Sequence, residues 1–159
     1  MGIWRNGGTS TPSQGFFNGN LLTNWAQTVL NELPPVLDLA ITPTNPVIAG
    51  LERSYGKDVQ TVVDYGFYFA DAHKQAGVLT ALKHFPGHGS STKDSHKGFV
   101  DVSNSWDAIE LEPYKSLIEH NQGDMIMAAH VFLKQMSDDG KVPTSLSKIA
   151  ITDVLRGQL

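Results

Sequence analysis

The chain has 159 residues, a formal net charge of −4 at pH 7, 40% hydrophobic and 18% charged residues, and no cysteine. This composition predicts a soluble globular protein with one core, and it excludes disulfide bonds and thiolate metal sites. The negative charge argues against nucleic acid and anionic membranes as partners, and no apolar run reaches the roughly 20 residues of a membrane span.

The N-terminal residues differ in character from the rest of the chain. Residues 1–19 are rich in Gly, Asn, Ser and Thr and show no apolar period, so we expect an irregular segment there and a domain over residues 20–159. The N-terminus also lacks the basic-then-apolar pattern of a signal peptide, which predicts a cytoplasmic location.

Helical patterns recur along the domain. Apolar residues at three- and four-residue spacing predict a helix over residues 21–33, which two prolines end. A second helix is predicted between Asp58 as N-cap and Gly77 as C-cap. Further helices are predicted to begin near Pro113 and, near the C-terminus, after a cap at Ser147.

Three polar side chains in these regions receive a local interpretation. His73 lies in the polar end of the second helix and is expected to be solvated. Asp107 and Glu110, three residues apart, resemble a capping box in front of the Pro113 helix.

Three apolar runs predict buried strands at residues 36–40, 78–82 and 125–131. Strands that alternate with helices indicate parallel pairing with right-handed crossovers, as in an α/β barrel or a doubly wound sheet. In both folds the site lies at the C-terminal ends of the strands. A complete eight-strand barrel usually needs about 250 residues, so this chain is predicted to form only part of one.

Polar residues occur where the predicted strands end. Asp38 lies within the first run and is interpreted equally as a ligand contact or as a cap of the following loop. Lys83 and His84 follow the second run, and His130 lies near the end of the third, where it either lines the site or caps the strand. Arg53 precedes a helix, a position that suits either a bound anion or a structural ion pair.

Histidines cluster in the loop that follows the second strand. This loop holds three of the six histidines, His84, His88 and His96, and together with Asp94 they could ligate zinc. A Pro-Gly pair prevents a helical His-x-x-x-His face, and the spacing matches no helix-borne metal motif, so neither a metal nor another cofactor is expected. His88 is interpreted as a structural residue whose ring bonds to backbone.

An ordered set of motifs resembles family 3 of the glycoside hydrolases, and within it the branch of β-N-acetylglucosaminidases, or β-N-acetylhexosaminidases. A lone His-Phe-Pro-Gly would be a weak signal, but the whole set in order is specific. The motifs extend over residues 35–159 and are Val36-Leu37-Asp38-Leu39, Arg53-Ser54-Tyr55-Gly56, Lys83-His84-Phe85-Pro86-Gly87-His88-Gly89 with Asp94-Ser95-His96, Met127-Ala128-Ala129-His130, and Pro143-Thr144-Ser145-Leu146-Ser147.

The resemblance implies a barrel that hydrolyses glycosides with retention, through a covalent glycosyl-enzyme on an aspartate. Arg53, Lys83 and His84 match sugar-binding positions, and Asp94 and His96 match the acid/base dyad of the glucosaminidase branch. Residues two apart in an extended loop point to the same side, so the carboxylate can reach the imidazole and fix its tautomer. Such a histidine takes the place of the carboxylic acid that is usual in glycosidases.

The nucleophile that the resemblance implies is expected outside this sequence. In the family it lies on a strand shortly after the helix that here contains Leu155, and thus beyond Leu159. The predicted fold is therefore a partial (β/α)8 TIM-barrel-like α/β domain with about three central βα units. Such a chain is expected to turn over little substrate alone and to self-associate through exposed sheet edges. Gly87, Gly89 and Gly98 are expected to let the loop swing over a sugar.

The expected partner is a small carbohydrate that ends in β-linked N-acetylglucosamine. Two alternatives stay open. The first is a non-catalytic sugar-binding fragment, and the second is a β-glucosidase specificity within the same family, against which the Asp94-Ser95-His96 triplet argues.

Overall fold

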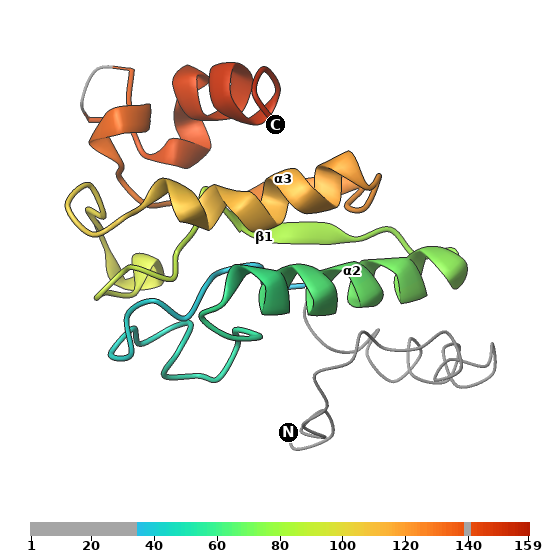
Figure 1. Cartoon of the computed structure of the whole chain (residues 1–159). Helices are drawn as coiled ribbons and strands as arrows, with labels where there is room; N and C mark the ends of the chain where they lie inside the picture. The colour runs from blue at the N-terminus through green and yellow to red at the C-terminus, as the bar shows by residue number, and fades with distance from the viewer. Residues whose placement is uncertain (1–34, 139–140) are drawn as a thin grey trace.

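The structure, a computed structural model, describes residues 35–138 and 141–159 (Figure 1). The irregular segment predicted for residues 1–19 and the helix predicted for residues 21–33 lie outside the described residues. Within the described ranges, helices and strands alternate as α2 (Val59–Gln75), β1 (Ala81–Phe85), α3 (Glu112–Glu119) and β2 (Met125–Ala128). The short helical turns are η2 (Ser95–Lys97), η3 (Ala108–Leu111), η4 (Lys134–Met136), η5 (Thr144–Leu146) and the π-helix η6 (Ile149–Leu155).

β1 lies at the centre of three parallel chain segments. On one side it pairs in parallel with β2, with Ala81 opposite Met125. On the other side Val36 forms a parallel bridge with Lys83, and the Leu37 N–H donates to Lys83 O at 2.7 Å. The predicted parallel α/β arrangement is therefore confirmed, whereas the number of βα units stays a prediction.

The strands differ from their predicted bounds because backbone pairing, and not the length of an apolar run, decides where a strand ends. The first predicted strand, residues 36–40, is reduced to the bridge at Val36. β1 spans residues 81–85 rather than the predicted 78–82. Its later end means that it includes Lys83 and His84, which the apolar pattern places in a loop. β2 ends at Ala128, earlier than the predicted residue 131.

α2 and α3 pack against each other alongside β1 (Figure 1). α2 begins after Asp58, whose carboxylate accepts a hydrogen bond from Thr61 N–H at 2.9 Å. It ends before Gly77, whose positive φ of 72° favours glycine. α3 begins at Glu112 with Pro113 in its first turn. These helix boundaries are confirmed because local capping residues set them.

The core fills the space between the sheet and the two helices. Phe85 and Tyr114 meet edge to face there, with ring centroids 5.7 Å apart. His73 is buried as well, so the prediction of a solvated side chain is wrong. Its Nδ1 lies 2.8 Å from Phe69 O and its ring stacks on that of Phe69, which lets the imidazole leave water without losing a hydrogen bond. Other fully buried core residues are Leu37, Leu39, Val62, Leu82, Leu117, Val131 and Leu133.

The C-terminal segment lies on the far side of α3 from α2 in Figure 1, where it is coloured red. The predicted Ser147 cap is confirmed, because its hydroxyl accepts a hydrogen bond from Ala150 N–H at 3.1 Å. In the described ranges, no helix is both long enough and apolar enough to cross a membrane.

Candidate functional site

The buried carboxylate of Asp38 organises the C-terminal end of β1. This residue is 1% exposed, and its Oδ2 lies 2.6 Å from His84 Nδ1. Its Oδ1 accepts hydrogen bonds from the backbone N–H groups of His84, at 3.3 Å, and His88, at 2.7 Å. The carboxylate therefore binds the turn after β1 and does not cap the loop that follows Asp38, so the capping interpretation is wrong.

Two cations accompany Asp38. Lys83 is 3% exposed, and its burial lowers the pKa of its ammonium group; the charge of Arg53 lowers this pKa further, while Asp38 opposes both effects. Arg53 donates from Nη1 to Val47 O at 3.2 Å, and its Nε–H has no partner among the described residues. No ion pair in the described ranges includes Arg53, so the structural ion pair is not observed. Such donors suit a ligand that is rich in oxygen acceptors.

The turn after β1, residues 86–91, is buried throughout. Gly89 must be glycine, because a Cβ at this position would lie 1.7 Å from Leu39 O. Close packing therefore requires glycine in this turn, whereas the expectation that Gly87 and Gly89 let the loop swing stays a prediction. Gly98 lies in the exposed part of the loop, and for this residue the expectation stays a prediction.

Asp94 and His96 lie together at the short helical turn η2. The Nδ1 of His96 is 2.8 Å from Asp94 Oδ1, which also accepts a hydrogen bond from His96 N–H at 2.9 Å. The backbone bond from His96, followed by the side-chain bond, lowers the pKa of Asp94, so the carboxylate is ionised at neutral pH. An ionised carboxylate only accepts hydrogen bonds, so Nδ1 carries the proton and Nε2 remains free for a ligand. The His96 side chain is 78% exposed.

A shallow groove of about 430 Å³ adjoins this pair. The Nζ of Lys97 lies 3.9 Å from Asp94 Oδ2 in this region, and Phe99 is 68% exposed. The groove is lined by Pro46, Lys93, Asp94, Lys97, Gly98 and Phe99.

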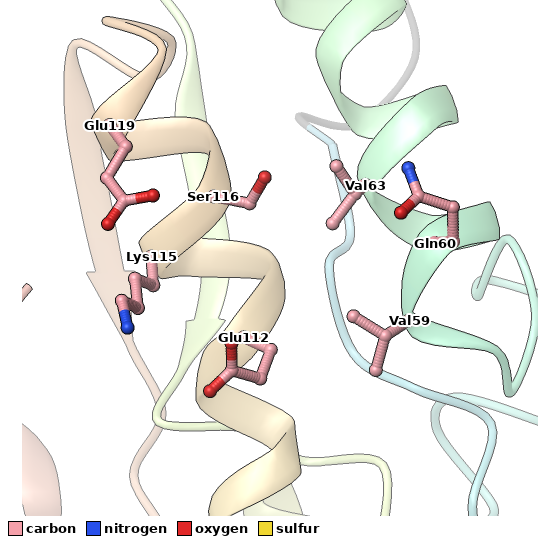
Figure 2. Close-up of a pocket in the computed structure, with 7 residues that line it drawn as sticks. All are labelled: Val59, Gln60, Val63, Glu112, Lys115, Ser116 and Glu119. Carbon is pink, nitrogen blue, oxygen red and sulfur yellow. The ribbon is translucent and has the colours of Figure 1, made fainter.

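A second groove, of about 320 Å³, lies between α2 and α3 (Figure 2). Figure 2 shows α2 contributing Val59, Gln60 and Val63, and α3 contributing Glu112, Lys115, Ser116 and Glu119. None of these residues belongs to the predicted site, so the groove beside Asp94 is the one that adjoins the candidate chemistry.

His88 connects the buried turn to the Asp94–His96 pair. Its Nε2 lies 3.1 Å from the hydroxyl of Ser95, the first residue of η2. Burial lowers the pKa of the His88 imidazole, although Asp38 opposes the effect, so the ring is neutral at pH 7. The ring thus bridges two parts of the site through a side-chain contact, whereas its predicted bond to backbone stays a prediction.

His130 lies apart from these contacts. β2 ends before it, its side chain is exposed, and its Nδ1 lies 2.7 Å from Ser145 Oγ. This contact ties His130 to η5 and not to Asp38 or His96, so a role in lining the site stays a prediction. The described residues also contain no group of three His, Asp or Glu side chains that could hold a metal ion.

Glu110 is the residue of this region that the sequence did not reveal. It is 1% exposed, and its Oε2 accepts a hydrogen bond from Gly89 N–H at 3.0 Å. Burial raises the pKa of Glu110 to about 7. The predicted capping box is half wrong: Asp107 does cap η3, through a 2.9 Å bond from Ile109 N–H, but Glu110 turns inward. A glutamate three residues after a cap has the same local pattern in both cases, so the sequence held no signal that separates them.

Comparison with known proteins adds a family and several relatives. A family model described as the glycosyl hydrolase family 3 N terminal domain matches residues 26–159. A β-hexosaminidase from Tolumonas auensis is 35% identical over 129 residues, which cover 77% of this chain and 38% of that protein.

Two solved structures are similar to this chain. One is a glycoside hydrolase family 3 β-N-acetylglucosaminidase from Paenibacillus sp., with a TM-score of 0.75, 32% identity, and coverage of 88% of this chain and 28% of that one. The other is NagZ from Neisseria gonorrhoeae in complex with N-trifluoroacetyl-D-glucosamine, with a TM-score of 0.69, 28% identity, and coverage of 86% and 39%. The chain thus spans less than half the length of each of these relatives.

Proposed function

This chain belongs to glycoside hydrolase family 3, and on that premise we propose that it supplies the acid/base and sugar-binding residues of an enzyme that hydrolyses terminal β-linked N-acetylhexosamine glycosides. The observation that carries the proposal is the 2.8 Å contact between Asp94 Oδ1 and His96 Nδ1, in a loop that the His88–Ser95 contact connects to the buried turn after β1. Because the chain spans 38% of the Tolumonas auensis β-hexosaminidase, the activity is assigned to a longer protein that contains this chain.

His96 acts as the proton donor and acceptor in this proposal. In its protonated form, Nε2 donates a proton to the glycosidic oxygen as the leaving group departs. The neutral ring then takes a proton from the water that hydrolyses the glycosyl-enzyme. Asp94 keeps the proton on Nδ1 through the hydrogen bond described above and so directs the exchangeable site to Nε2. The exposure of the ring lets it approach a sugar bound at the neighbouring turn.

Lys83, His84 and Arg53 bind the sugar in this proposal. Because His84 Nδ1 is engaged with Asp38, its Nε2 is available to a sugar hydroxyl. Lys83 and Arg53 offer charged donors that sugar oxygens can accept. Asp38 belongs to the same group through its contact with His84, since it accepts two hydrogen bonds from His84 and one from His88.

The nucleophile is assigned to a part of the longer protein outside this chain. Among the described residues, the buried carboxylates are those of Asp38 and Glu110, and each accepts backbone N–H groups of the turn after β1. Both are also 1% exposed, so neither carboxylate is accessible to an anomeric carbon. A retaining mechanism with the Asp94–His96 pair needs a further carboxylate, which agrees with the family pattern.

The proposal is tested with the longer protein and an aryl N-acetyl-β-glucosaminide. Replacing His96 with alanine should lower the rate of hydrolysis roughly 10²- to 10⁴-fold, the usual contribution of a general acid. His120→Ala is the matched control, because His120 is also exposed and its contacts, from Nδ1 to Ser116 O at 2.7 Å and from its ring to Phe67, lie outside the proposed site. A His96→Ala protein with a rate close to that of the control would refute the assignment. The 159-residue chain alone should show negligible turnover, and robust turnover would require another nucleophile.

A sugar-binding fragment without catalysis is the second candidate. It is favoured by a different observation: the described residues offer cations and histidines to a sugar, whereas the buried carboxylates of Asp38 and Glu110 are each 1% exposed and so inaccessible to it. N-acetylglucosamine should then raise the melting temperature of the chain while remaining unprocessed. A β-glucosidase specificity would instead appear as cleavage of an aryl glucoside in preference to the N-acetylglucosaminide by the longer protein.

A further inference from the structure

Two buried carboxylates hold the turn after β1 from different elements. Asp38, next to the Val36 bridge, accepts from His88 N–H at 2.7 Å. Glu110, in η3, accepts from the next amide, Gly89 N–H, at 3.0 Å. Both acidic residues are 1% exposed, so these bonds are shielded from water. Consecutive peptide groups are thereby fixed by two side chains that approach from separate parts of the chain.

The backbone of the turn packs directly on Glu110. A Cβ on Gly87 would lie 2.6 Å from both the Cβ and the Oε2 of Glu110, and Gly87 has a φ of +118°, which few other residues adopt. Trp106, just before η3, donates from Nε1 to Pro86 O at 3.0 Å. The turn therefore has little freedom to move relative to the η3 segment while these contacts are made.

The same turn is connected to the Asp94–His96 pair. His88, between the two fixed amides, places its Nε2 3.1 Å from Ser95 Oγ. Ser95 opens η2, and Asp94 and His96 flank it in sequence. A continuous series of contacts thus leads from Glu110 through one amide, one imidazole and one hydroxyl to the candidate acid/base pair.

We propose that Glu110 is a positioning residue for the Asp94–His96 pair. By holding the Gly89 amide it fixes the peptide and ring of His88, and through Ser95 it fixes where η2 presents the pair. The inference rests on the proposed function of His96 but assigns Glu110 no contact with the sugar. Glu110 acts through the turn, so its effect differs from that of a residue that only fills the core.

The groups around Glu110 make its protonation state important. The charge of Asp38 adds to burial in raising its pKa, whereas Ser90 and the Gly89 amide oppose the rise. Tyr114, on α3, is fully buried, and burial, Asp38 and Glu110 all raise its pKa, which places it near both acids. No ion pair of the described residues includes Glu110. Ionisation of Glu110 therefore adds a second buried negative charge beside Asp38, and no described cation forms an ion pair with it.

The test follows the amide of Gly89 and the ring of His96 by NMR in the 159-residue chain, as the pH is varied. In the wild type, the Gly89 amide shift should titrate with a midpoint near pH 7, the value that burial gives Glu110. Glu110→Gln keeps the acceptor but cannot ionise, so it should abolish this titration and leave the His96 signals unchanged. Glu110→Met keeps the volume but not the acceptor, so Gly89 amide exchange should accelerate roughly 2- to 10-fold and the His96 signals should move.

Glu112→Gln is the matched control, because Glu112 is exposed and lies two residues further along the chain. It should behave as the wild type in every measurement. The proposal would be overturned if Glu110→Met showed the same Gly89 amide exchange rate and the same His96 signals as the wild type. Glu110→Gln replaces Glu110→Met as the test if the methionine variant fails to fold. In that case the proposal is overturned if the Gly89 amide of Glu110→Gln still titrates as it does in the wild type.

Activity of the longer protein separates this inference from the proposed function. At pH 6, Glu110→Met should lower kcat/KM about tenfold, while Glu110→Gln should stay within about twofold of the wild type. Suppose that the longer protein hydrolyses no glycoside but that its His96 NMR signals shift in Glu110→Met. This result would refute the proposed function and support the positioning role. Hydrolysis that is indifferent to both variants would refute the positioning role alone.

Discussion

The free energy of unfolding of the wild-type chain should fall as the pH rises from about 4.5 to about 7, because Glu110 ionises over this range. Replacing Glu110 with glutamine should remove this decrease. Burial raises the pKa of Glu110 from 4.5 to about 7, so the folded chain holds this proton more tightly than the unfolded chain does. The stabilising effect of the neutral form is complete below pH 4.5 and is lost as the pH rises through about 7. A pKa difference of about 2.5 corresponds to about 3 kcal/mol in the free energy of unfolding.

The assay is urea denaturation of the 159-residue chain and its Glu110→Gln variant between pH 4 and pH 8. Other groups titrate in both proteins, so the informative quantity is the difference between their unfolding free energies. Relative to the variant, the wild type should become less stable by about 3 kcal/mol across this range. Glu112→Gln, an exposed neighbour, should give a curve parallel to the wild type. If the Glu110→Gln difference varied by less than about 0.5 kcal/mol, Glu110 would ionise as an exposed glutamate does, and the reasoning would fail.

Four further outcomes are expected. Gly89→Ala should destabilise the chain by about 3 kcal/mol or more, since the new Cβ would lie 1.7 Å from Leu39 O; a thermal melt with an unchanged midpoint would contradict the packing described. Asp38→Ala leaves three donors without their acceptor, one buried and two partly buried; it should destabilise the chain by about 3 kcal/mol or more and abolish N-acetylglucosamine binding, as calorimetry would check. Asp94→Asn in the longer protein should lower kcat roughly 10- to 1,000-fold because the tautomer of His96 is no longer fixed, and a rate within twofold of wild type would argue against the dyad. The chain alone should self-associate through the edge of β2 that is unpaired among the described residues, so sedimentation as a monomer at high concentration would count against this.

Asp94 and Glu110 show which contacts of the site the sequence can predict and which it cannot. Asp94 and His96 are two residues apart, so the geometry of a short turn brings them together whatever surrounds it. Glu110 binds an amide 21 residues earlier in the chain, and its local pattern is that of an ordinary cap. Whether such a carboxylate faces water or the core depends on how η3 packs, which no spacing records.

The strand ends show the same limit. The apolar runs predicted parallel strands in the right order, because burial on both faces requires such runs. They did not predict that Lys83 and His84 belong to β1 itself, since register with β2 and with the Val36 bridge decides this. His73 shows a related limit: its partner Phe69 lies only four residues earlier in α2, but the burial of both side chains depends on how that helix packs, which the polar character of the helix end does not indicate.

The sequence by itself determined the alternation of helices and parallel strands, the helix boundaries at Asp58, Gly77 and Pro113, and the pairing of Asp94 with His96. These features depend on caps, periodicity and short spacings, all of which act within a few residues. Only the tertiary structure decided that Asp38 and Glu110 share one turn. Removal of both carboxylates from water, and the charge of Asp38 beside Glu110, arise from segments far apart in the chain. Desolvation is a property of the packed molecule, and it governs the protonation of this site.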